Sequence, residues 1–164
     1  MPDKETIERA RHDAAQGKSA STQAGEFVRE EVHHIREGKH GARSPQQAIA
    51  IGLSKARRAG VKLRPPKAGK ASKQTARKAA RDVARGRKRR RPSARRARAV
   101  RGALRREPRS SASRPALARQ AHRAAMRRSP RERRAAAKKA VRTKGPARRR
   151  AAARKAARTR ARSR

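Results

Sequence analysis

The chain has 164 residues, of which 53 are Lys or Arg and 11 are Asp or Glu, so its formal net charge is +42. Alanine supplies 37 of the hydrophobic residues and larger apolar side chains only 17, too few for one core of this length when each ordered residue loses roughly 1–2 kcal/mol of backbone entropy. The absence of cysteine excludes disulfides and thiolate sites, and no apolar run approaches the ~20 residues of a membrane span.

Charge and large apolar residues divide the chain into a head and a tail. Residues 1–63 hold 12 Lys or Arg, 8 Asp or Glu and 11 of the larger apolar side chains. Residues 64–164 hold 41 Lys or Arg and only 3 Asp or Glu. We therefore expect a small helical head at 1–63, a Pro-rich hinge at 64–69 and an Ala/Arg/Lys-rich cationic tail at 70–164.

The first strong helical pattern of the head covers residues 26–37. Val28, Val32 and Ile35 recur there at the spacing of one helix face, and a glycine follows the last of them. A weaker pattern covers residues 4–16. The only Phe of the chain, Phe27, belongs to the stronger pattern, and we expect it in the core.

The second strong pattern covers residues 45–59. Ser44 is a helix N-cap, a proline follows it, and Gln47 completes a capping box. Gly52 lies on the apolar stripe of this helix and would allow a partner helix to approach closely. Because the connector from the first helix is short, we predict an antiparallel helical hairpin over residues 23–60.

The head resembles a small bacterial family of unknown function. The likeness is carried by the Glu-Gly-Lys turn within residues 34–39 and by the Gln-Ala-Ile-Ala-Ile-Gly-Leu-Ser-Lys-Ala run that begins at Gln47. The resemblance covers residues 34–63 and implies the helical hairpin and a bacterial origin, but no activity.

The tail is low-complexity sequence interrupted by prolines, and its composition favours disorder through self-repulsion and the lack of a core. Helix-prone segments lie within it. Ser129 and Glu132 form a capping box, and Gly145 followed by Pro146 ends that segment. The predicted fold class is thus all-α: a small helical hairpin followed by a long, basic and largely disordered tail.

The tail is similar to the Ala/Lys/Arg/Pro-rich carboxyl-terminal tails of linker histones and bacterial histone-like proteins, as residues 135–140 and 150–158 illustrate. Its 32 Arg against 9 Lys favour bidentate phosphate contacts. The cations that we expect to contact nucleic acid are Arg85, Arg87, Lys88, Arg89, Arg90, Arg91, Arg95, Arg96, Arg98, Arg133, Arg134, Lys138, Lys139, Arg148, Arg149, Arg150, Arg154 and Lys155.

Catalytic chemistry is not indicated. No phosphate-cradling loop or dinucleotide fingerprint is present. His33, His34 and His40 are close in sequence, but without cysteine and with few neighbouring carboxylates they are interpreted as solvated surface residues. We expect no enzyme activity, no catalytic residue, no cofactor and no metal.

The function that the sequence predicts is sequence-tolerant binding and compaction of duplex DNA through phosphate neutralisation, with the protein in the cytoplasm at the nucleoid. The tail has no aromatic side chain for base stacking or membrane insertion, so no membrane partner is expected. Two alternatives remain open: an RNA- or ribosome-associated protein, and an adaptor whose head binds a protein partner or a second copy of the chain.

Overall fold

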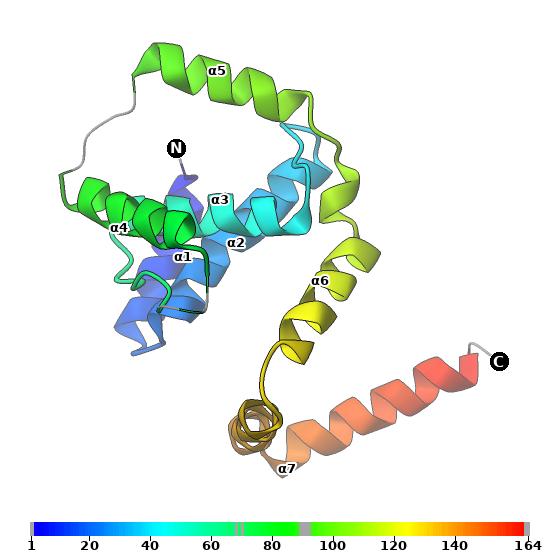
Figure 1. The fold of residues 1–164 in the computed structure, drawn as a ribbon. Coiled ribbons are helices and arrows are strands. Elements are labelled where there is room, and N and C mark those ends of the chain that lie inside the picture. Colours follow the sequence, from blue (N-terminus) through cyan, green and yellow to red (C-terminus); the bar gives the residue numbers. More distant parts are fainter. Residues whose placement is uncertain (1, 68, 70, 89–92, 163–164) are drawn as a thin grey trace. The chain divides into compact units, whose positions relative to one another are not determined.

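The computed structural model describes residues 2–67, 69, 71–88 and 93–162 (Figure 1). The chain forms two compact units, Met1–Gln120 and Ala121–Arg164. Its helices in the described residues are α1 (Lys4–Ala15), α2 (Ala20–Arg36), α3 (Pro45–Arg58), α4 (Lys73–Lys88), α5 (Ala94–Arg105), the short 3-10 turn η1 (Ser110–Ala112), α6 (Arg114–Met126) and α7 (Pro130–Arg162).

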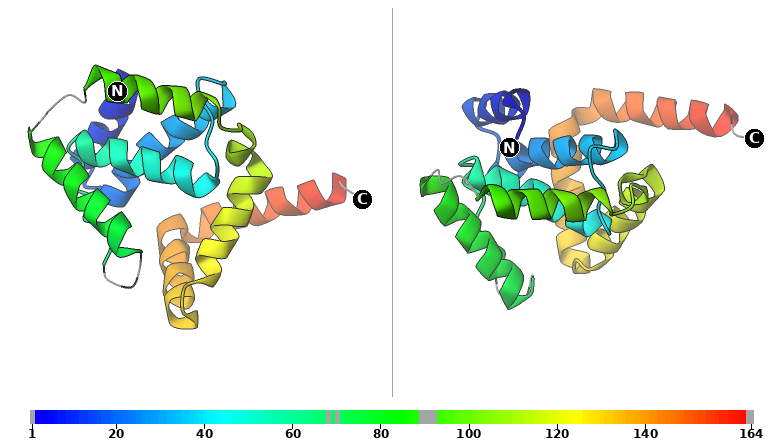
Figure 2. Two further views of the ribbon diagram at one scale, coloured as in Figure 1. Left: turned by 45° about the horizontal axis from the view of Figure 1, so that its top comes forward. Right: turned by 90° about the horizontal axis from the view of Figure 1, so that it is seen from above.

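Helices α1 to α4 pack in chain order within the first unit, each against the one before it (Figure 2). The two strong helices predicted in the head are confirmed as α2 and α3, and they form the expected hairpin. The predicted N-cap of α3 is also confirmed, because Ser44 Oγ accepts a hydrogen bond from the Gln47 amide at 3.2 Å.

Alanine builds most of the core. Nine hydrophobic residues are buried among those the structure describes, and apart from Phe27 and Ile35 all of them are alanines: Ala10, Ala24, Ala42, Ala48, Ala56, Ala79 and Ala112. Phe27 is 1% exposed, as expected, and packs with Ala10, Ala24 and Ala56. Small side chains bury little area individually, but they let helix backbones approach closely and make dense contacts.

Helices α2 and α3 approach each other closely at Gly52, as the sequence predicted. A Cβ atom on Gly52 would lie 2.7 Å from Val28 Cα, 2.9 Å from the Val28 amide nitrogen and 3.0 Å from the Phe27 carbonyl oxygen. All three neighbours are backbone atoms of α2, which cannot rotate away. Any larger residue at this position of α3 would therefore push the two helices apart.

The prediction of a largely disordered tail is wrong, whereas the all-α class is right. Helices α4 to α7 cover most of residues 73–162. One reason is local, because Ala, Arg and Lys are among the best helix formers. The other reason is tertiary packing. The expectation of disorder counted only large apolar side chains, but alanines of the tail are also buried in the core. Ala79 and Ala112, both from the predicted tail, are 4% and 0% exposed.

Helix α4 is attached to α3 by polar and backbone contacts. Asp82 accepts a hydrogen bond from Ser54 Oγ at 2.7 Å, and its carboxylate lies 3.9 Å from Arg58 Nε. Near the end of α4, Gly86 lies against the Arg57 carbonyl group, and a Cβ there would lie 3.3 Å from Arg58 Cα. These contacts fix one end of the cationic half on the hairpin.

A second attachment joins the α2–α3 turn to the carboxyl end of α5 and the segment that follows it. The Gly41 amide donates to the Leu104 carbonyl at 2.8 Å, and the Ala42 amide donates to the Pro108 carbonyl at 3.0 Å. Arg36 Nε donates to the Ala112 carbonyl at 2.9 Å. Ala112 joins Ile35, Ala42 and Ala48 in a second buried cluster, so residues far beyond the head complete its core.

In the second unit, α7 consists of two helical arms separated at Gly145, which has φ 65° and ψ 170° (Figure 1). That backbone conformation is accessible almost only to glycine. The predicted stop at Gly145 and Pro146 is thus confirmed, and the chain re-enters helix directly afterwards. The predicted capping box is confirmed too: Glu132 Oε2 accepts from the Ser129 amide at 2.9 Å, and Ser129 Oγ accepts from the Glu132 amide at 3.2 Å.

None of the helices in the described part of the chain combines the length and the apolar character needed to cross a membrane.

Candidate nucleic-acid interface and a buried ionic cluster

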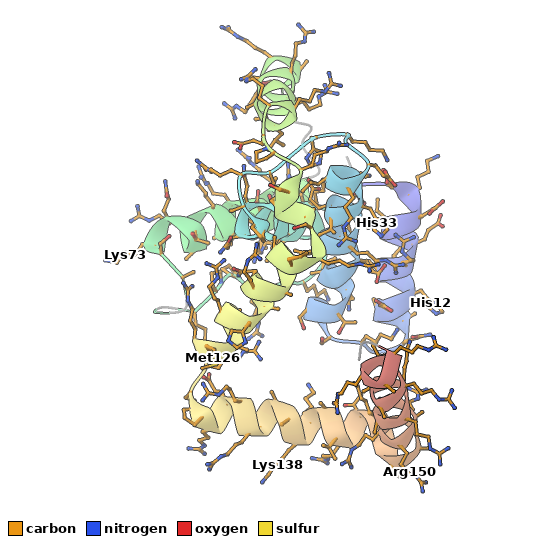
Figure 3. All side chains as sticks on the ribbon, turned by 90° about the vertical axis from the view of Figure 1, so that its right-hand side faces the viewer. His12, His33, Lys73, Met126, Lys138 and Arg150 are labelled. Atoms are coloured by element: carbon orange, nitrogen blue, oxygen red, sulfur yellow. The ribbon has the colours of Figure 1, made fainter. Side chains whose placement is uncertain are left out.

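Helix α7 concentrates positive charge without covering any core. It carries 15 Lys or Arg and one acidic residue among its 33 residues. The structure describes the whole of this helix, and none of its residues is buried. Side chains project from α7 on every side, with Lys138 on the first arm and Arg150 on the second (Figure 3). At 1.5 Å per residue the two arms are about 22 and 25 Å long.

The second arm presents a cationic face with a regular spacing. Arg150, Arg154 and Arg158 follow one another at intervals of four residues, and together with Lys155 and two alanines they line a shallow surface recess. Four residues advance a helix by about 6 Å, close to the ~6.8 Å of duplex axis over which one DNA strand advances by two phosphates. Arg158 was not among the predicted residues, although the spacing from Arg150 indicates it.

One predicted cation of α7 has another role. Arg133 is half-buried, and its Nη1 donates to the Arg128 carbonyl at 3.0 Å and to the Met126 carbonyl at 3.5 Å. It therefore caps the carboxyl end of α6, where carbonyl groups lack helical partners. The other predicted cations of α7 are exposed: Arg134, Lys138, Lys139, Arg148, Arg149, Arg150, Arg154 and Lys155.

A second cationic recess lies between α4 and α5. Its lining consists of Lys78, Arg81, Asp82 and Arg85 from α4 and Arg96 from α5. Because Asp82 is bonded to Ser54 and faces Arg58, four cations surround a carboxylate that is already engaged. The structure thus brings the predicted Arg85 and Arg96 together and adds Lys78 and Arg81, which the sequence interpretation missed.

The remaining predicted cations are not brought into this recess. Arg95 and Arg98 are exposed on α5. Arg87 and Lys88 belong to α4, but their side chains lie outside the described residues, as do Arg89, Arg90 and Arg91 altogether. Most of the densest predicted block of cations, residues 85–91, therefore cannot be placed relative to either recess.

The head contains a buried cluster of opposite charges that the sequence interpretation did not find. Glu30 and Glu31 on α2 are 5% and 1% exposed. Lys55 Nζ on α3 lies 2.9 Å from Glu30 Oε1 and 2.6 Å from Glu31 Oε2. Burial alone would lower the pKa of Lys55, but the hydrogen bonds and charges of Glu31 and Glu30 outweigh it and raise that pKa.

Two histidines extend this cluster. His40 Nε2 lies 2.9 Å from Glu31 Oε1, and His34 Nε2 lies 3.0 Å from Asp3 Oδ2. Their side chains are only 16% and 13% exposed, so the interpretation of these two as solvated surface residues is wrong, whereas His33 is exposed. A usable signal existed: Glu31 lies four residues from both Phe27 and Ile35, and so shares their buried helix face.

Comparison with known proteins bears on the head alone. Residues 4–68, which contain α1, α2 and α3, match a family described as a family of unknown function (DUF6496). The expected likeness of the head to a small uncharacterised family is thus confirmed, and the likeness of the tail to histone-like proteins finds no support. No curated protein and no solved structure matches the chain.

Proposed function

We propose that this chain is a non-enzymatic, sequence-tolerant DNA-binding protein that neutralises duplex phosphates with the cations of α7 and of the α4–α5 recess. The observation that carries the proposal is α7 itself. A helix with 15 cations, one acidic residue and no buried residue has no packing role that would explain its composition.

The energetics of α7 favour a polyanionic partner. Like charges at four-residue spacing, such as Arg150, Arg154 and Arg158, repel one another and each pair costs about 0.2–0.5 kcal/mol. Phosphates placed beside these side chains remove that repulsion, and the DNA releases condensed counterions. Alanines between the cations keep the helix narrow, so its backbone can lie close to a duplex.

Tolerance of sequence follows from the side chains that the cationic helices offer. Arginine and lysine bind phosphate oxygens, which are the same at every base pair. Trp and Tyr are absent from the chain, and its only Phe is buried in the head. No Trp, Tyr or Phe ring is therefore exposed for stacking on unpaired bases, which favours a duplex over a single strand as the ligand.

The proposal is tested by the salt dependence of binding of the full chain to a random-sequence DNA duplex, followed by fluorescence anisotropy. An α7 variant and a head variant each lose four charges through substitution by glutamine. The α7 variant changes Arg150, Arg154, Lys155 and Arg158, and the head variant changes the exposed Lys4, Arg11, Arg43 and Lys62.

We expect the slope of log affinity against log salt to become shallower by about 3–4 in the α7 variant, since each lost phosphate contact removes roughly 0.9. In the head variant the slope should change by less than about 1. Equal losses in both variants would show that net charge alone governs binding and would contradict the site. Tighter binding of an RNA duplex of the same length by more than tenfold would reassign the ligand to RNA.

A further inference from the structure

We infer that Glu31, His34 and His40 form a binding site for a divalent transition-metal ion of the zinc class, inside the head and separate from the cationic helices. Each of the three residues offers one ligand atom that lies within 4.8 Å of the other two. Two imidazoles and one carboxylate are a donor set that suits zinc and its neighbours, whereas calcium and magnesium prefer oxygen ligands alone.

One pair of ligand atoms lies close to the spacing that such an ion requires. In a tetrahedral zinc site with ligand distances near 2.1 Å, ligand atoms are about 3.4 Å apart. Glu31 Oε1 and His40 Nε2 are 2.9 Å apart, so they need to separate by only about half an ångström. The two histidine side chains retain 13% and 16% exposure, which gives an ion access from solvent.

The hydrogen bonds of His40 identify its free nitrogen. His40 Nδ1 lies 3.0 Å from the Gly41 carbonyl oxygen, which can only accept, so Nδ1 carries the proton. In the neutral ring, Nε2 is then the unprotonated nitrogen, and it lies 2.9 Å from Glu31 Oε1, so two acceptor atoms are close together. A cation between them, or a second proton on the ring, resolves this conflict.

His34 is arranged in the same manner. Its Nε2 lies 3.0 Å from Asp3 Oδ2, which leaves Nδ1 as the nitrogen for an ion. A carboxylate or carbonyl that holds the second ring nitrogen is the usual outer partner of a metal-binding histidine, because it fixes the tautomer and the ring orientation. Both histidines of this cluster therefore have the outer partner that a metal site requires.

Lys55 holds the carboxylate without blocking it. Its Nζ contacts Glu31 Oε2 at 2.6 Å, whereas His40 contacts the other oxygen, Oε1. The metal can thus use Oε1 while the lysine keeps Oε2. Glu31 and His34 belong to α2 and His40 to the loop before α3, so the ion would fasten this loop to the helix. The same loop carries Gly41, whose amide binds the Leu104 carbonyl.

The test uses full-length protein freed of metal with a chelator and then titrated with Zn²⁺ by calorimetry and with Co²⁺ by visible absorption. We expect one ion per chain, the absorption bands of tetrahedral Co²⁺, and a rise in Tm on adding Zn²⁺. His34→Gln and His40→Gln should each weaken binding at least tenfold. His33→Gln is the matched control, because His33 is exposed beside the site, and it should bind as the wild type does.

Each outcome of this experiment decides the proposal. Absence of binding to folded wild-type protein, or an equal loss in His33→Gln, would overturn it and would leave the two histidines as polar partners of Glu31 and Asp3. Because the wild-type titration is decisive by itself, the result does not depend on whether a variant folds. The far-ultraviolet circular dichroism of each variant shows whether its loss of binding reflects the site.

Discussion

Substitution of Gly52 by alanine is the sharpest probe of the hairpin. The new Cβ would lie 2.7 Å from Val28 Cα, where unstrained contacts begin near 3.4 Å, so α2 and α3 must separate by about 0.7 Å or more. Forcing a methyl group into a close-packed contact costs about 1–3 kcal/mol. The better helix propensity of alanine returns up to ~1 kcal/mol, so we expect a net loss of about 1–2 kcal/mol.

Gly25→Ala is the matched control, since Gly25 lies within α2 and a Cβ there has no neighbour within 4 Å. This substitution should stabilise α2 by about 0.5–1 kcal/mol through helix propensity alone. The same chemical change is thus expected to have opposite signs at two positions of one hairpin.

Amide hydrogen exchange followed by mass spectrometry measures both effects in the full chain. Gly52→Ala should accelerate exchange of the protected amides in α2 and α3 about tenfold, because a tenfold change corresponds to about 1.4 kcal/mol. Gly25→Ala should slow exchange in α2 severalfold. Slower exchange in both variants would refute the close approach at Gly52 and leave helix propensity as the sole effect.

Two further substitutions test the buried charges and the cap of α7. Lys55→Met leaves Glu30 and Glu31 buried without their ammonium partner and should lower the free energy of unfolding, measured in urea, by about 3 kcal/mol. Adding Glu31→Gln should restore part of that loss. A loss below about 0.5 kcal/mol would contradict the ion pairs. Ser129→Ala removes the hydrogen bond that caps the Glu132 amide. It should accelerate amide hydrogen exchange in the first turn of α7 about fivefold, which corresponds to a loss of stability near 1 kcal/mol. Unchanged exchange there would argue against the cap.

The elements that sequence reasoning predicted well are those fixed by local chemistry. Ser44 and Ser129 begin helices because their hydroxyl groups accept from amides that would otherwise lack partners. Gly145 separates the arms of α7 because few other residues adopt its backbone conformation. Gly52 was also predicted, since a glycine on the apolar stripe of a helix indicates a close neighbour.

The elements that sequence reasoning missed depend on contacts distant in the sequence. Ala112 completes a cluster with Ile35 and Ala42, yet nothing near Ala112 distinguishes it from the other alanines of the chain. His40 is 16% exposed, and Glu31 of the preceding helix faces it. Single-sequence periodicity describes one helix at a time, so it does not show which polar groups meet across the hairpin.

The two attachments of the cationic half have a consequence for α5. Asp82 attaches α4, the helix that precedes α5, to α3. Leu104, near the carboxyl end of α5, is hydrogen-bonded to the α2–α3 turn. Helix α5 is therefore attached to the hairpin at its carboxyl end. This attachment has already removed part of the conformational freedom that an untethered segment would lose on binding a ligand. Arg95, Arg96 and Arg98 therefore lie on a helix that is already attached. If the protein binds DNA as proposed, their contribution to the affinity for DNA should exceed that of equal charges on an untethered peptide.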